Sequence, residues 1–139
     1  MMTSLLLCCV LGEDVSSTLL DYYEKGQLVK KDLSFMLRTC FQECVNRFEC
    51  PHVILFPFLA SVYLTPYERD LKRNCESIRT FVREIVNRRR SENESLASQK
   101  EDLLSILISD PLFCDNTESI IDELLTIFFA VSQTSAQTT

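Results

Sequence analysis

Apolar residues along the chain recur mainly at spacings of three and four, the period of an α-helix. The repeat is most regular between Asp70 and Arg90, where charged residues fill most of the remaining positions. We therefore predict one amphipathic helix over 70–90, ending in three arginines where the helix dipole favours cations. These arginines, Arg88 to Arg90, could bind phosphate or a membrane surface, but a solvated helix end is the favoured interpretation. The residues of the repeating stripe are Leu71, Cys75, Ile78, Val82, Ile85 and Arg89.

Four further segments carry helical signals with identifiable ends. Gly26, Pro51 and Pro111 close the first three. The last begins near Asp115, because an acid there and Glu118 three residues later have the spacing of an N-terminal cap. No run alternates with period two for long enough to predict a strand, so the predicted fold class is all-α, with a polar loop over 91–99. The predicted helices are Val15–Lys25, Lys30–Phe48, Lys100–Asp110 and the segment from Asp115 onward.

The helix nearest the C-terminus combines an apolar body with a polar end. Ile120 to Val131 is mostly apolar, whereas Ser132 to Ser135 carry hydroxyls and an amide. Polar groups buried at the end of such a helix cost roughly 1–3 kcal/mol each unless they find partners. Two interpretations remain open: a core helix with a frayed end, which periodicity alone favours, and a buried site.

Composition narrows the class of protein. With 139 residues the chain forms at most one domain, and an apolar fraction of 46% is too high for disorder. A net charge of -6 argues against a nucleic-acid partner. The apolar segment Val53–Leu64 is shorter than the roughly 20 residues of a membrane-spanning helix. Burial in a core is favoured there over contact with a membrane surface. Met1–Leu11 lacks the basic start of a signal peptide.

The seven cysteines show no paired framework and fit the reduced thiols of a cytosolic protein. A zinc site built from Cys40, Cys44, Cys50 and His52 is an alternative. It lacks the short Cys-x-x-Cys knuckle, and Cys40 and Cys44 lie on an apolar helix stripe, so core positions are favoured. His52 is the only histidine, and no nucleophile elbow, phosphate loop or dinucleotide fingerprint accompanies it.

The segment Ala130-Val131-Ser132-Gln133-Thr134-Ser135 follows, in part, the order Ala or Gly, Gly, any residue, acid, Thr, Thr or Ser. It resembles the oxygen-activation helix of the cytochrome P-450 family, the heme-thiolate monooxygenases. Segments 100–111, 74–90 and 11–14 resemble the stretches that precede this helix, in the family's order. The resemblance implies a partial P-450 fold over 1–139, with several helices ending in a long buried helix. It also places Val53–Leu64 in a substrate-access region near the membrane.

The resemblance implies heme as cofactor and a distal site on this helix. Ala130, Val131 and Thr134 would bind the cofactor, and Thr134 and Gln133 would be catalytic through proton delivery. Val131 stands where glycine is usual, and its branched side chain narrows the groove. Gln133 stands where an acid is usual; its amide binds water but does not titrate, so delivery through water is expected.

The resemblance further implies a central fragment of a family member. None of the seven cysteines has the Phe-x-x-Gly-x-Arg-x-Cys context of the iron ligand, so no metal ligand is assigned. We expect a small apolar substrate, a redox partner reductase and no nucleic acid. The expected location is the cytoplasm or the cytoplasmic face of the endoplasmic reticulum, without a membrane anchor. The alternative is a non-catalytic helical remnant or a partner-dependent interaction protein.

Overall fold

The computed structural model describes residues 2–11, 15, 17–95, 102–113 and 115–137, but not the side chains of 2–4, 6, 93–95 and 131–137. The chain divides into two compact units. Unit 1 comprises residues 1–17 and 79–139, and unit 2 comprises residues 18–78. The prediction that both belong to one partial domain stays a prediction. Over the described residues the structure is mostly helical, as predicted, with one small two-stranded antiparallel sheet.

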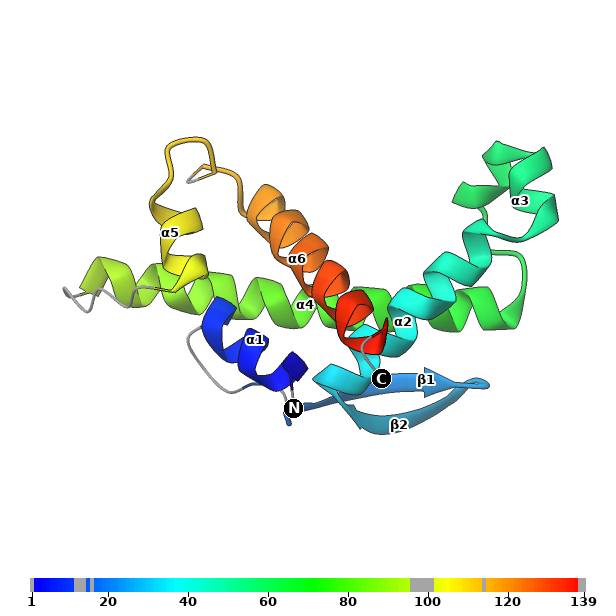
Figure 1. Cartoon of the computed structure of the whole chain (residues 1–139), viewed down its shortest axis with the longest axis horizontal. Helices are drawn as coiled ribbons and strands as arrows, with labels where there is room; N and C mark the ends of the chain where they lie inside the picture. Colours follow the sequence, from blue (N-terminus) through cyan, green and yellow to red (C-terminus); the bar gives the residue numbers. More distant parts are fainter. Residues whose placement is uncertain (1, 12–14, 16, 96–101, 114, 138–139) are drawn as a thin grey trace. The chain divides into compact units, whose positions relative to one another are not determined.

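Unit 2 begins with a β-hairpin, formed by β1 (Leu19–Glu24) and β2 (Gln27–Asp32) (Figure 1). The predictions of a helix over 15–25 and of a strictly all-α fold are therefore wrong. Lys25 and Gly26 form the two-residue turn with φ angles of 51° and 78°. Two consecutive positive φ angles suit the right-handed twist of a tight hairpin. The prediction that Gly26 ends a helix is also wrong, because Gly26 is the second residue of this turn.

The hairpin is bonded to the first turns of α4 (Pro66–Ser95). The fully buried Asn74 side chain accepts a hydrogen bond from the Tyr23 backbone N–H at 2.6 Å and donates one to the Tyr23 carbonyl at 3.0 Å. The Gly26 N–H donates to Asp70 Oδ2 at 2.8 Å. A two-stranded hairpin is marginal alone in water. These side-chain bonds therefore replace, at the edge of β1, the partners that a third strand would supply.

Helix α2 (Leu33–Phe48) confirms the predicted second helix, three residues later than expected because β2 extends to Asp32. The short helices α3 (Pro51–Leu55) and η1 (Pro57–Ser61) follow. Of the apolar residues over 53–64, only Val53 is buried, and the predicted burial of this segment is wrong. The buried apolar residues of unit 2 are Tyr22, Leu33, Met36, Leu37, Cys40, Val53, Leu71 and Ile78.

Helix α4 confirms the predicted amphipathic helix but is longer at both ends. At its start, Glu68 N–H donates to Thr65 Oγ1 at 3.2 Å, and Thr65 N–H donates to Glu68 Oε2 at 3.1 Å. This reciprocal pair is a capping box. At its end the helix continues to Ser95, so the predicted loop is wrong over 91–95, while 96–99 lie outside the described residues.

Unit 1 contains α1 (Met2–Leu11), the part of α4 from Arg79, α5 (Leu103–Ser109) and α6 (Thr117–Gln137) (Figure 1). Helices α1, α5 and α6 contact one another. The predicted short helix before Pro111 is confirmed as α5. Over the described residues no helix is long and apolar enough to span a bilayer. The core residues include Leu7, Leu11, Val82, Val86, Leu104, Ile120, Ile121 and Leu124.

Candidate functional site

The N-terminus of α6 is fixed by Asn116. Its Oδ1 accepts hydrogen bonds from the N–H groups of Glu118 at 3.1 Å and Ser119 at 3.3 Å. Asparagine is among the best N-cap residues because its side-chain oxygen reaches the free N–H groups of the first turn. The prediction of Asp115 as the cap is wrong by one residue, because the helix begins at Thr117.

Helix α6 buries one face and exposes another. Ile120, Ile121, Leu124 and Phe128 are all at most 4% exposed, and they recur at spacings of three and four. Glu123, Thr126 and Ala130 are exposed. The expectation of a long buried helix is therefore corrected to a helix with a single buried face over its described side chains.

The predicted site residues lie near the C-terminal end of α6. Ala130 is on the exposed face, one turn after Thr126, whose hydroxyl donates to the Asp122 carbonyl at 2.8 Å. The side chains of Val131, Gln133 and Thr134 lie outside the described residues. The backbone of α6 is helical through Gln137, so positions 130 and 134 are one turn apart on the same helix. The site itself stays a prediction.

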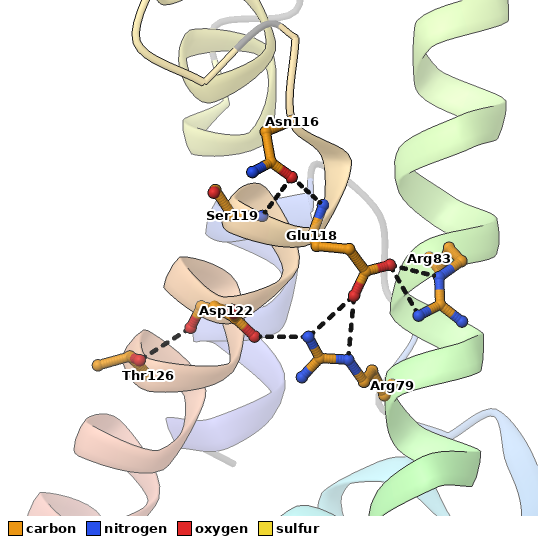
Figure 2. Close-up of polar contacts among 7 residues, drawn as sticks. All are labelled: Arg79, Arg83, Asn116, Glu118, Ser119, Asp122 and Thr126. Atoms are coloured by element: carbon orange, nitrogen blue, oxygen red, sulfur yellow. Dashed lines mark hydrogen bonds and ion pairs between the residues drawn. The ribbon is translucent and has the colours of Figure 1, made fainter.

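A cluster of four charged side chains connects α4 and α6 within unit 1 (Figure 2). Arg79 pairs with Glu118 at 2.9 Å and with Asp122 at 2.8 Å, and Arg83 pairs with Glu118 at 2.8 Å. Arg79, followed by Arg83, lowers the pKa of Glu118 below its usual range. This cluster was not predicted from the sequence. The pattern that could have indicated it is two arginines four residues apart on one helix and two acidic residues four apart on another.

The zinc alternative is not supported by the placement of its residues. Cys40 is fully buried, whereas the Sγ of Cys44 lies 4.0 Å from the Sγ of Cys75. Cys50 donates its thiol proton to the Asn46 carbonyl at 3.3 Å, and His52 is exposed. Across the described part of the chain, no three metal-ligating side chains come together.

Unit 2 contains a cavity of about 250 Å³ beside α2. The charged groups beside this cavity form contacts with one another and with the backbone. Arg47 pairs with Glu68 at 3.2 Å, donates to the Val62 carbonyl at 3.0 Å and stacks over the Tyr63 ring. The Thr65 backbone N–H, then Arg47, hold the pKa of Glu68 below its usual range despite desolvation. These contacts account for the positions of Arg47 and Glu68 by structural roles alone. They give no reason to assign a catalytic role to either residue. The lining includes Glu43, Asn46, Arg47, Cys50, His52, Leu59, Val62, Leu64, Thr65, Tyr67 and Glu68.

Comparison with known proteins identifies no relative of this chain. It matches no protein-family model, no curated protein and no solved structure. The interpretation of α6 therefore depends on the residues of this sequence and on the geometry of its two units.

The charged cluster predicts a pKa that can be measured. Replacing Arg79 and Arg83 together by methionine should raise the pKa of Glu118 toward the ordinary value of about 4.3. With the arginines present, the stabilisation by ionised Glu118 is complete above that value and is lost as the pH falls through the lower folded-state pKa. Carboxyl NMR titration measures the shift. Arg69→Met, an exposed change on α4, is the control, and an unchanged pKa in the double variant would contradict the pairing.

Proposed function

We propose that this chain is the helical region of a heme-thiolate monooxygenase in which α6 faces the heme. The observation that carries the proposal is the continuity of α6 from Thr117 to Gln137, across the whole hexapeptide that begins at Ala130. The long helix α4 and the short helix α5 precede it, which is the order that the resemblance implies.

Among the proposed site residues, Ala130 is the one whose side chain is described, and its position is compatible with the distal side of such a site. Ala130 presents only a methyl group on the exposed face of α6, so a flat ring could lie against the helix there. The thiols do not fit the role of iron ligand, which requires a thiolate. Hydrogen bonding with Cys75 and burial raise the pKa of Cys44, and hydrogen bonding with Cys40, followed by burial, raises the pKa of Cys75 to about 12. The proposed iron ligand is therefore not one of these two cysteines.

In the proposed enzyme, heme would supply oxygen activation. The residues of this chain would orient the bound groups and deliver protons to them. The Thr134 hydroxyl both donates and accepts hydrogen bonds, so it can pass a proton to a distal ligand and be reprotonated by water. Gln133 can hold that water through its amide but cannot replenish the proton by titrating. Ala130 keeps the helix surface open beside the ring.

The role of Thr134 is tested in the heme-loaded protein with its reductase. Thr134→Ala should divert oxygen from product to hydrogen peroxide, lowering product formed per oxygen consumed by roughly tenfold or more, because the proton donor is lost. Thr134→Ser retains a hydroxyl and should restore most of the yield. Oxygen uptake, peroxide and product are measured together. Equal yields for all three proteins would contradict the assignment.

The family proposal itself has a separate test. The transcript that encodes Thr139 should continue into a Glu-x-x-Arg helix and a glycine-rich loop with the iron-ligating cysteine. Protein that includes both segments should give the thiolate-type spectrum when reduced and treated with carbon monoxide, and residues 1–139 alone should not. A transcript without these segments would overturn the proposal.

A second candidate function, contact with a membrane surface through Val53–Leu64, is favoured by one specific observation. Leu55 and Phe58 are 72% and 67% exposed, and Ile54, Phe56, Val62 and Leu64 are exposed as well. Apolar side chains gathered in one short segment mark interaction surfaces. We propose that this segment enters the interface of a bilayer, where binding strengthens with the apolar area buried.

Vesicle binding tests this second function. Replacing Phe56 and Phe58 by serine should weaken partitioning into phosphatidylcholine vesicles by roughly tenfold or more, since each buried phenyl contributes on the order of 1.5 kcal/mol or more. The matched control is Leu112→Ser in unit 1, an apolar side chain that is 83% exposed. Cosedimentation gives the partition coefficients. If the control loses as much binding as the double variant, the segment is not the contact.

A further inference from the structure

Three cysteines of unit 2 converge where α2 and the first turns of α4 meet. Cys40 and Cys44 are one turn apart on α2, and Cys75 is on α4. The Sγ atoms of Cys44 and Cys75 are 4.0 Å apart, in hydrogen-bonding contact. Cys75 also has the Cys40 thiol as a neighbour. Two thiols on different helices thus lie within reach of a covalent bond after a small approach, because a disulfide requires about 2.05 Å between its sulfurs.

The three thiols differ in access to solvent. Cys40 is fully buried, whereas Cys44 and Cys75 are partly exposed. An oxidant in solution can therefore reach Cys44 and Cys75 but not Cys40. Cys50 is also partly exposed, but its thiol donates to the Asn46 carbonyl, and no described sulfur lies in contact with it. Access and proximity together single out one pair.

We propose that Cys44 and Cys75 form a redox-sensitive disulfide that ties α2 to α4. The oxidant is a low-molecular-weight disulfide such as oxidised glutathione. The thiolate of one of the two cysteines attacks one of its sulfurs and releases one glutathione thiolate, giving a mixed disulfide. The thiolate of the other cysteine then attacks the protein sulfur of this mixed disulfide and releases the second glutathione thiolate. Two protein thiols are oxidised, one glutathione disulfide is reduced, and the two thiol protons pass through water to the leaving thiolates.

This chemistry is slow at neutral pH and accelerates in base. Hydrogen bonding between the thiols and burial raise the pKa of Cys44, and Glu43 adds to the effect while Arg47 opposes it. Hydrogen bonding with Cys40 and burial, with a smaller contribution from Glu43, raise the pKa of Cys75 to about 12. The thiolate is the nucleophile, so the rate should rise about tenfold per pH unit over roughly pH 7 to 9. The inference does not depend on a heme role for α6.

The test treats the full chain with oxidised glutathione and maps its disulfides without reduction. Glu43 lies between Cys40 and Cys44, so cleavage after glutamate and arginine separates these two cysteines. Cys75 falls in its own peptide, between Arg73 and Glu76. The expected product links the Cys44 peptide to the Cys75 peptide. Its formation should raise the Tm by roughly 5 °C or more, because the cross-link restricts the unfolded chain.

Variants separate the two steps. Cys75→Ser should stop at the glutathione adduct of Cys44, and Cys44→Ser should remove the cross-link. Cys50→Ser, the matched control, should leave both the linked peptide and its rate unchanged. A cross-link that involves Cys40, a stable adduct on Cys44 in the unmodified chain, or a rate independent of pH would each overturn the proposal.

Discussion

The buried ion pair between Arg89 and Asp102 is the constraint on which unit 1 depends. The side chains of the two residues are 4% and 6% exposed, and Arg89 Nη2 lies 3.1 Å from Asp102 Oδ2. The same nitrogen donates to the Leu11 carbonyl at 2.6 Å, the last residue of α1. Asp102 uses its other oxygen to cap α5, accepting from the Ser105 N–H at 2.8 Å. One arginine on α4 therefore fixes the end of α1 and the start of α5.

A buried ion pair of this kind fixes which helices lie together more than it adds to the net stability of the fold. Removing two charges from water costs several kcal/mol each, and their attraction repays this cost only if both partners are present. Asp102 Oδ2 accepts no hydrogen bond from the described residues, so its partner there is the charge of Arg89. Any arrangement that separated α4 from α5 would leave an uncompensated charge. This requirement holds these two helices together while α6 packs its apolar face beside α1 and α5.

Sequence periodicity predicted the parts of the fold that depend on local spacing. The stripe over α4 was confirmed, and it already included Arg89. The prediction that 88–90 form a solvated helix end was wrong, because α4 continues to Ser95 and Arg89 is buried. The hairpin was not predicted because the spacing of its leucine and aromatic residues is compatible with both a helix and a strand. The turn at Lys25 and Gly26 is the feature that distinguishes the two. The partner of Arg89 was not predictable, because pairing with Asp102 depends on tertiary packing. The proposed site residues Val131, Gln133 and Thr134 rest on sequence resemblance alone.

The dependence of unit 1 on the charge of Arg89 is tested most directly by a double-mutant cycle in urea. Arg89→Met should lower the free energy of unfolding by about 3–5 kcal/mol, because it leaves Asp102 buried and uncompensated. Adding Asp102→Asn, which keeps a capping oxygen without the charge, should recover most of that loss. Arg69→Met, an exposed change on the same helix, is the control. A loss for Arg89→Met within about 0.5 kcal/mol of the control would contradict the account.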